Sequence, residues 1–174
     1  MAIEEPIFNV VEKDNSFELR TYQPKIIAEV YFNADMNESA RNGFRIIADY
    51  IFGNNTARSG NAESISMTAP VVVQATNQGW KVYFVMPKKY TISNLPAPNS
   101  HQILIKQVQQ KKIAVIKFSG LVDEVKMDKK AKELHEWMIK KHLIPIGNPE
   151  LARYNPPWTL PFLRRNEVMV EFEY

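Results

Sequence analysis

Histidine is the side chain most often used for metal binding and acid–base chemistry, and this sequence contains three. His135 and His142 lie seven residues apart in a segment with helical periodicity. They share one side of that helix but are separated by about 10 Å along its axis. A straight helix therefore cannot bring both to one metal ion. His101 stands alone near a strand edge, so the sequence predicts no metal site.

Other catalytic patterns are missing from the sequence. It has no cysteine, which excludes a thiol nucleophile, a thiolate metal site and a disulfide framework. It also lacks a nucleophile elbow, a P-loop, a GxGxxG fingerprint and an HExxH motif. Its acidic residues alternate along predicted strands or stand next to lysines, so no catalytic carboxylate pair can be picked out. We therefore expect a protein that is not an enzyme.

The net charge of +3 is weak evidence for an acidic partner. The densest basic stretch, residues 126–142, mixes lysines with Asp128, Glu133 and Glu136. Mixed signs on a helix indicate a solvated face, so we expect no nucleic-acid partner.

The segment NPPWTLPFLRRNEVMV, residues 155–170, carries more apolar surface than a solvated loop needs. Its three prolines restrict the backbone and keep this part of the chain out of a sheet. Such stiffness lowers the entropy cost of holding apolar side chains in place. Those side chains are Trp158, Leu160, Phe162 and Leu163. Two interpretations are open: the segment closes one end of the fold over its core, or it walls a ligand cleft.

Arg164 and Arg165 follow these apolar side chains and come just before Glu167. An ion pair with Glu167 would fix where the loop ends. Contact with a carboxylate of a ligand is the alternative.

The elements that position this segment follow from periodicity. Alternation predicts a strand over residues 24–32, and a helix follows, with Asp35 and Glu38 at capping-box spacing. Ala40, Phe44 and Ala48 recur at four-residue steps on this helix and share one face. The two small alanines leave room for something flat, so this face is the expected floor of a cleft.

The order strand, helix, strand, strand occurs twice. Further strands are predicted over residues 64–73, 79–87, 111–120 and 166–174, with a second helix over 124–143 and additional strands over 16–22 and 101–109. In the last strand we expect Val168, Val170, Phe172 and Tyr174 to face the core and Glu167, Glu171 and Glu173 to face solvent. The repeat predicts an α+β fold: a doubled βαββ unit forming an antiparallel sheet or open distorted barrel, with two helices packed outside.

Length and hydropathy predict one soluble domain over residues 1–174. No apolar run is long enough to span a membrane, and Met1 to Val10 lacks the basic-then-apolar order of a signal peptide. We expect a cytoplasmic protein.

Several stretches closely resemble the SOUL family of haem-binding proteins, and the resemblance covers nearly the whole chain. They are FELRTYQP, GFRIIADYIFGNN, ISMTAPV, YFVMP and RYNPPWTLPFLRRNEVMV. The resemblance implies a doubled βαββ fold, which is also found in small-molecule effector domains of bacterial regulators. It further implies binding of haem or another tetrapyrrole in a shallow apolar cleft between the first helix and the loop before the last strand.

The family's binding residues carry over unevenly. Arg41 matches a basic helix position proposed to meet a haem propionate. Asp49 stands where haem-binding relatives can carry a lysine, and Thr159 lies near a loop position that is also basic in those relatives. Thr21 stands where some members have the histidine proposed to ligate iron. The resemblance therefore implies that any haem is held mainly by apolar contact, with iron ligated weakly or not at all.

Together these observations predict non-enzymatic binding of haem or a similar flat hydrophobic ligand. The expected ligand-binding residues are Ala40, Arg41, Phe44, Ala48, Trp158, Leu160 and Phe162. The alternative is an effector-sensing or protein-interaction module of the same fold that does not bind haem.

Overall fold

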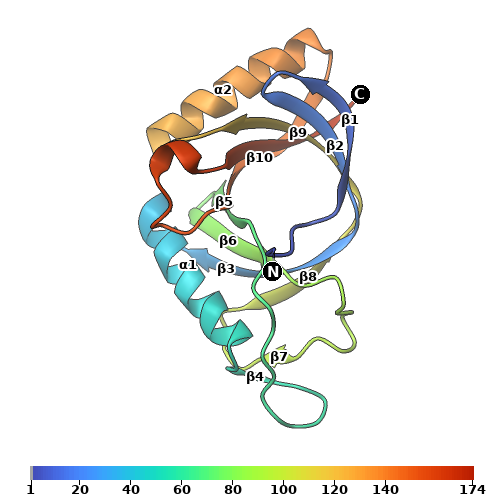
Figure 1. Ribbon diagram of the computed structural model, residues 1–174, viewed down its shortest axis with the longest axis vertical. Coiled ribbons are helices and arrows are strands. Elements are labelled where there is room, and N and C mark those ends of the chain that lie inside the picture. The colour runs from blue at the N-terminus through green and yellow to red at the C-terminus, as the bar shows by residue number, and fades with distance from the viewer. Residues whose placement is uncertain (1) are drawn as a thin grey trace.

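The computed structural model describes residues 2–174 and contains two helices and one large antiparallel sheet (Figure 1). The nine strands of the sheet lie in the order β1 (Phe8–Asp14), β2 (Phe17–Tyr22), β9 (Lys111–Phe118), β11 (Asn166–Glu173), β10 (Ile144–Arg153), β5 (Val71–Thr76), β6 (Gly79–Val85), β3 (Lys25–Phe32) and β8 (Leu104–Val108). The remaining elements are α1 (Met36–Ile51), α2 (Glu124–Lys140), the short pair β4 (Asn55–Thr56) and β7 (Ala97–Pro98), and the 3₁₀ turn η1 (Pro161–Leu163). This confirms the α+β fold; the sheet is curved but open.

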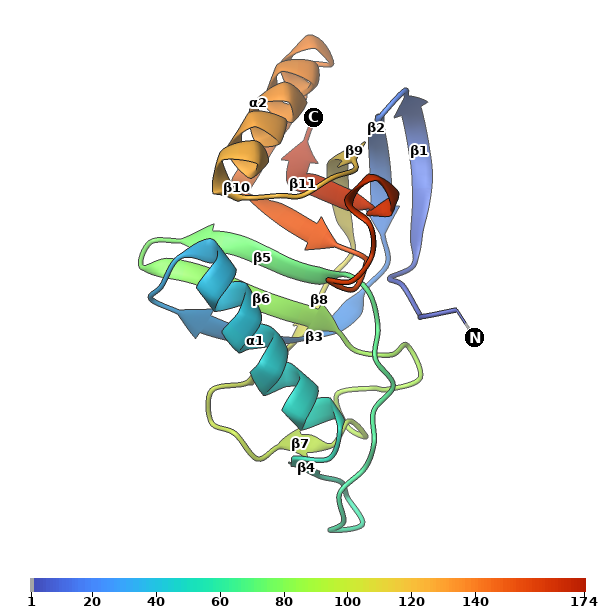
Figure 2. The same ribbon diagram turned by 60° about the vertical axis from the view of Figure 1, so that its left-hand side comes forward.

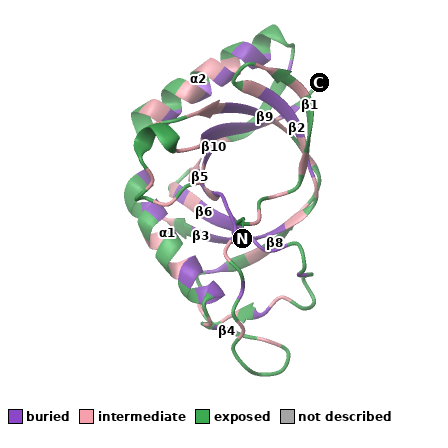
Figure 3. Cartoon of the chain, viewed as in Figure 1, coloured by how far each residue is buried: buried purple, intermediate pink, exposed green. Residues whose placement is uncertain are grey.

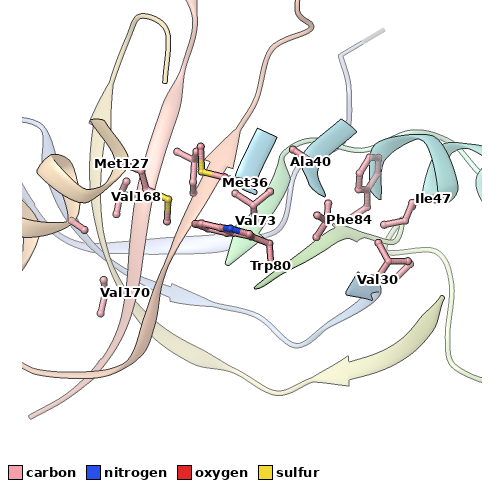
Figure 4. Packing of buried hydrophobic residues seen from close by; sticks show 14 of the residues in the cluster. Val30, Met36, Ala40, Ile47, Val73, Trp80, Phe84, Met127, Val168 and Val170 are labelled. Carbon is pink, nitrogen blue, oxygen red and sulfur yellow. The ribbon is translucent and has the colours of Figure 1, made fainter. Parts of the chain in front are cut away.

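Both helices lie on the convex side of the sheet, and each begins at an aspartate. The Asp35 carboxylate accepts a hydrogen bond from the Glu38 amide, and Asp123 caps α2 in the same way. Helix α1 packs against β3, β5 and β6, and α2 packs against β9, β10 and β11. In Figure 4, Trp80 lies between the side chains under α2 and those under α1, so the two helices share one apolar core.

One long two-stranded ribbon joins the two ends of the sheet. Strands β2 and β3 follow each other with a short bend at Pro24, and β8 and β9 do the same beside them. The register is continuous across the bend, because Tyr22 pairs with Lys111 and Lys25 pairs with Val108. Figure 1 shows this ribbon curving around the interior of the molecule. The sheet is therefore bent into an incomplete ring.

The two halves are related by pseudo-symmetry and exchange their first strands. The first half contains β2, β3, α1, β5 and β6, and the second contains β8, β9, α2, β10 and β11. The halves meet where β5 pairs with β10. The leading strand of the first half, β2, pairs with β9 of the second, and β8 pairs with β3 of the first.

A second apolar cluster covers the concave side of the sheet. Its buried members are Tyr22, Ile27, Val72, Tyr83, Val85, Val115, Ala152 and Met169. Both faces of the central strands are therefore buried, as the purple strands in Figure 3 show.

This burial overturns part of the expected orientation of the last strand. Val168, Val170 and Phe172 are buried as predicted, but Glu167 is fully buried and Tyr174 is exposed. Alternation places Glu167 on the face opposite Val168. That face lies inside the curved sheet instead of in water.

Element boundaries also differ from the prediction, and one strand was missed. The strand expected over 64–73 begins only at Val71, and α2 ends at Lys140. Strand β10 was not predicted, because Pro145, Gly147 and Pro149 interrupt its pattern. The sheet accommodates them with a shift of register between Ile146 and Glu150.

Candidate functional site

The proline-rich loop between β10 and β11 has a closed base. The Tyr154 amide donates to the Arg165 carbonyl over 3.2 Å, and the Arg165 amide donates to Asn155 Oδ1 over 2.6 Å. The two ends of the loop are thereby held side by side.

Arg164 supports this loop from within. Its Nε donates to the Thr159 carbonyl over 2.8 Å, and its Nη2 donates to the Pro157 carbonyl over 2.5 Å. The Gly120 amide binds the Pro161 carbonyl at 2.9 Å and attaches the loop to the segment before α2. Arg165 forms the ion pair expected with Glu167, at 3.3 Å, and a second with Glu5 at 3.1 Å. Both arginines thus fix the loop.

The apolar side chains of this loop point into solvent. Trp158 is 83% exposed and Phe162 69% exposed, and Leu160 and Leu163 are also exposed. In Figure 3 the turn η1 is drawn green, the colour of exposed residues. The interpretation in which the loop closes over the core is therefore wrong.

Helix α1 carries the remaining predicted ligand-binding residues. Phe44 is 43% exposed, and its ring packs against Phe84 with centroids 5.7 Å apart. Ala40 and Ala48 are 9% and 8% exposed and belong to the core side of the helix. Arg41 is exposed and forms no ion pair with any residue in the range 2–174.

The two groups stand apart. They overlap in Figure 1, but the turned view of Figure 2 separates α1 from the loop, with β5 and the end of β10 between them. Arg153, at the end of β10, joins α1 to the segment before α2: its Nη2 lies 3.4 Å from Asn37 Oδ1 on α1 and 3.2 Å from the Val122 carbonyl. Five of the seven predicted site residues are thus exposed, Arg41 and Phe44 on α1 and Trp158, Leu160 and Phe162 on the loop, whereas Ala40 and Ala48 are buried beneath the first group.

A buried charge network holds the loop base to the rest of the sheet. The Arg20 guanidinium donates to both Glu167 oxygens, over 2.9 and 2.7 Å, and to Glu18 over 2.7 Å. The Tyr154 hydroxyl donates to Glu167 over 2.6 Å. Phe8 of β1 covers Arg20, whose Cζ lies 4.2 Å from the ring centroid. The residues of FELRTY and RRNEV therefore act together as an anchor, which sequence reasoning missed.

Electrostatics within this network favour the charged forms. Burial alone would raise the pKa of Glu167, but hydrogen bonds and charge from Arg20, with help from Tyr154 and Arg165, hold that pKa below its usual value. Burial raises the pKa of Tyr22 to about 12, although Arg20 opposes the shift. Every charge at the centre is paired, so the network is a structural anchor.

The described residues offer no cluster for iron or another metal. Within residues 2–174 no three His, Asp or Glu side chains gather closely enough to hold an ion. His101 and His142 are exposed, and His135 is half-buried, with an Nε2 that has no hydrogen-bond partner among those residues. Across the same range, no helix has the length and apolar character needed to cross a membrane.

Family comparison identifies the class of protein. The profile described as SOUL heme-binding protein matches residues 3–171. The chain therefore belongs to the SOUL heme-binding protein family. No curated protein matches it as a relative.

Solved structures share the fold at low sequence identity. The C-terminal domain of EcmrR is 12% identical with a TM-score of 0.65, over 90% of this chain and 96% of that one. The EcmrR chain in a complex with DNA gives 12% and 0.66, over 90% of this chain and 57% of that one. A structure described as a hydrolase from Listeria innocua is 9% identical with a TM-score of 0.62, over 94% of each chain. These similarities show the fold alone.

Proposed function

We propose that this protein binds haem or a similar flat tetrapyrrole, without catalysing a reaction, on the surface between α1 and the proline-rich loop. The observation that carries the proposal is the exposure of Trp158, Leu160 and Phe162 on a loop fixed by Arg164. Large apolar side chains held in water in one conformation are typical of a binding surface.

The residues suit the chemistry of a tetrapyrrole. Trp158 and Phe162 supply apolar contact for the faces of the macrocycle, and Phe44 supplies a second border. Arg41 is exposed and, among residues 2–174, forms no ion pair that would compete with a propionate. None of the seven residues can ligate iron, so the proposal assigns binding to the macrocycle and leaves the iron without a protein ligand from this surface. Membership of the SOUL family supports the same ligand class.

The contributions of these contacts differ in size. Burying a large aromatic side chain against a ligand contributes about 1.5–3 kcal/mol. An exposed cation meeting a carboxylate contributes about 0–1 kcal/mol. Trp158 should therefore matter more than Arg41.

Titration with hemin, followed by the Soret band, tests the proposal. We expect saturable binding by the parent, an affinity loss of about tenfold or more for Trp158→Ala, and a smaller loss for Arg41→Ala. Tyr174→Ala removes another exposed aromatic side chain, at the C-terminus, and serves as the matched control. The proposal fails if the parent shows no saturable shift, or if folded Trp158→Ala binds hemin as tightly as the parent. In that case a sensing or interaction module without haem becomes the better interpretation.

A further inference from the structure

A cavity of about 160 Å³ lies inside the bend of the ribbon, on the concave side of the sheet. The ribbon lines it with Tyr22, Lys25 and Lys111, and the strands opposite line it with Tyr83, Glu150 and Met169. None of the seven residues of the proposed tetrapyrrole surface lines this cavity.

Pseudo-symmetry relates two lysines of this cavity. Lys111 and Lys25 each stand two residues before an isoleucine of the ribbon, Ile113 and Ile27. Ile113 pairs with Glu171 across the sheet, whereas Ile27 pairs with Val85. Lys111 forms an ion pair with that Glu171 at 2.8 Å. At the equivalent position Lys25 has a valine and therefore lacks the carboxylate that neutralises Lys111.

The other charged side chains of the cavity also have partners. Lys81 lies 3.7 Å from Glu29, and Glu150 accepts a hydrogen bond from the Tyr83 hydroxyl over 2.8 Å. Lys25 Nζ lies over the Tyr22 ring, 4.7 Å from its centroid. Within residues 2–174 it forms no ion pair and donates no hydrogen bond.

The surroundings of Lys25 disfavour an isolated ammonium. Burial lowers its pKa; Glu150 partly opposes this shift, and Lys111 adds to it. A partly buried cation without an ion-pair partner in direct contact costs free energy, and an arriving anion would recover part of that cost. Lys25 also lines a second cavity, of about 450 Å³, beside the N-terminal segment.

We propose that this cavity binds a small single-ring carboxylate, with the carboxylate on Lys25 and the ring against Tyr22, Tyr83 and Met169. The size fits, because an apolar cavity of about 150 Å³ accommodates benzene. A tetrapyrrole is far too large for the same space. The site is therefore additional to the proposed tetrapyrrole surface and does not depend on it.

The charge of the ligand provides a first test that needs no variant. Benzoate, benzamide and benzylamine are titrated into the full-length protein, and binding is followed by calorimetry and by NMR shifts of the Met169 methyl group. We expect benzoate to bind at least about tenfold more tightly than benzamide, with benzylamine weakest. Equal affinities, preference for benzylamine, or no benzoate binding up to about 10 mM would overturn the proposal.

Variants of Lys25 provide the second test. Lys25→Met should weaken benzoate binding by about tenfold or more, and Lys25→Arg should keep it within about threefold. Lys112→Met is the matched control, because Lys112 is exposed and lies over Tyr174 outside the cavity. Unchanged benzoate affinity in Lys25→Met overturns the proposal. Hemin titration of the same variants should match the parent, so failure at one site is distinguishable from failure at the other.

Discussion

Arg20 carries a buried charge at the centre of the network. It is buried and makes four hydrogen bonds, to Glu18, Tyr22 and both oxygens of Glu167. Removing one partner of such a group leaves the other charge buried without compensation. We expect Arg20→Met to lower the free energy of unfolding by about 3–5 kcal/mol.

Urea denaturation measures this effect. Lys130→Met, which breaks the partly exposed pair of Lys130 with Glu133 at 3.1 Å, is the control and should change stability by about 0–1 kcal/mol. Combining Arg20→Met with Glu167→Gln should cost less than the sum of the two single changes. Strict additivity would show that the two residues are not coupled.

The same network predicts sensitivity to acid. The pKa of Glu167 is lowered in the folded protein against about 4.3 in an unfolded chain. The resulting stability is present above the unfolded value and is lost as pH falls through the folded one. The urea midpoint should therefore fall between about pH 5 and pH 3, and more steeply for the parent than for Glu167→Gln. Parallel curves for the two proteins would assign the acid sensitivity to other groups.

At the scale of elements, the close packing of α1 against β6 depends on Gly43. A Cβ added there would lie 2.6 Å from Val82 Cβ, closer than real contacts allow. Since Cβ atoms move only with the backbone, Gly43→Ala must push α1 away from β6. We expect a loss of about 1–3 kcal/mol despite the better helix propensity of alanine. Arg45→Ala, on the exposed side of the same helix, is the control in thermal denaturation, and equal midpoints would contradict the prediction.

The conformation of the proline-rich loop depends on hydrogen bonds from Arg164. Arg164→Met removes two hydrogen bonds to loop carbonyls but no core contact. We expect global stability to change by about 1 kcal/mol or less, and amide exchange of residues 157–163 to become faster. Hemin affinity should fall several-fold, because the loop must then be ordered on binding. Arg58→Met, in another surface loop, should change neither exchange nor affinity. Unaltered exchange in Arg164→Met would show that the prolines alone fix the loop.

An element could be predicted from the sequence when the residues that determine its structure lie within the element itself. Helix α1 was predicted because Asp35 and its apolar stripe lie within the helix itself. Strand β10 was missed because Pro145 and Gly147 look like turn residues, and only the neighbouring strands hold them in a sheet. The apolar loop was recognised, but its exposure depends on Arg164 and Gly120, whose partners a sequence does not reveal. Lys25 was also missed, because its isolation is defined by Val85 across the sheet.

At the scale of the whole molecule, the exchanged strands tie the halves together. Each half places its leading strand in the other, and Trp80 packs between the two helix-covered regions. Neither half can unfold without exposing the core of the other. We expect one cooperative transition, with the calorimetric enthalpy equal to the van't Hoff enthalpy. Two resolved transitions would show that the halves are separate folding units.

Exchange of leading strands is also what two identical chains do in a domain-swapped dimer. Residues 86–103 then correspond to a covalent linker between two protomers related by a two-fold axis. A chain carrying only the first βαββ half would leave β2 without β9 beside it and β3 without β8. A second copy would supply both missing strands, because in a two-fold assembly the leading strand of each protomer pairs with the sheet of the other. The fold of this protein therefore corresponds to a closed homodimer whose two protomers are joined in one polypeptide. The bend of the ribbon, where Lys25 lies, falls on the pseudo-two-fold axis that relates the two halves.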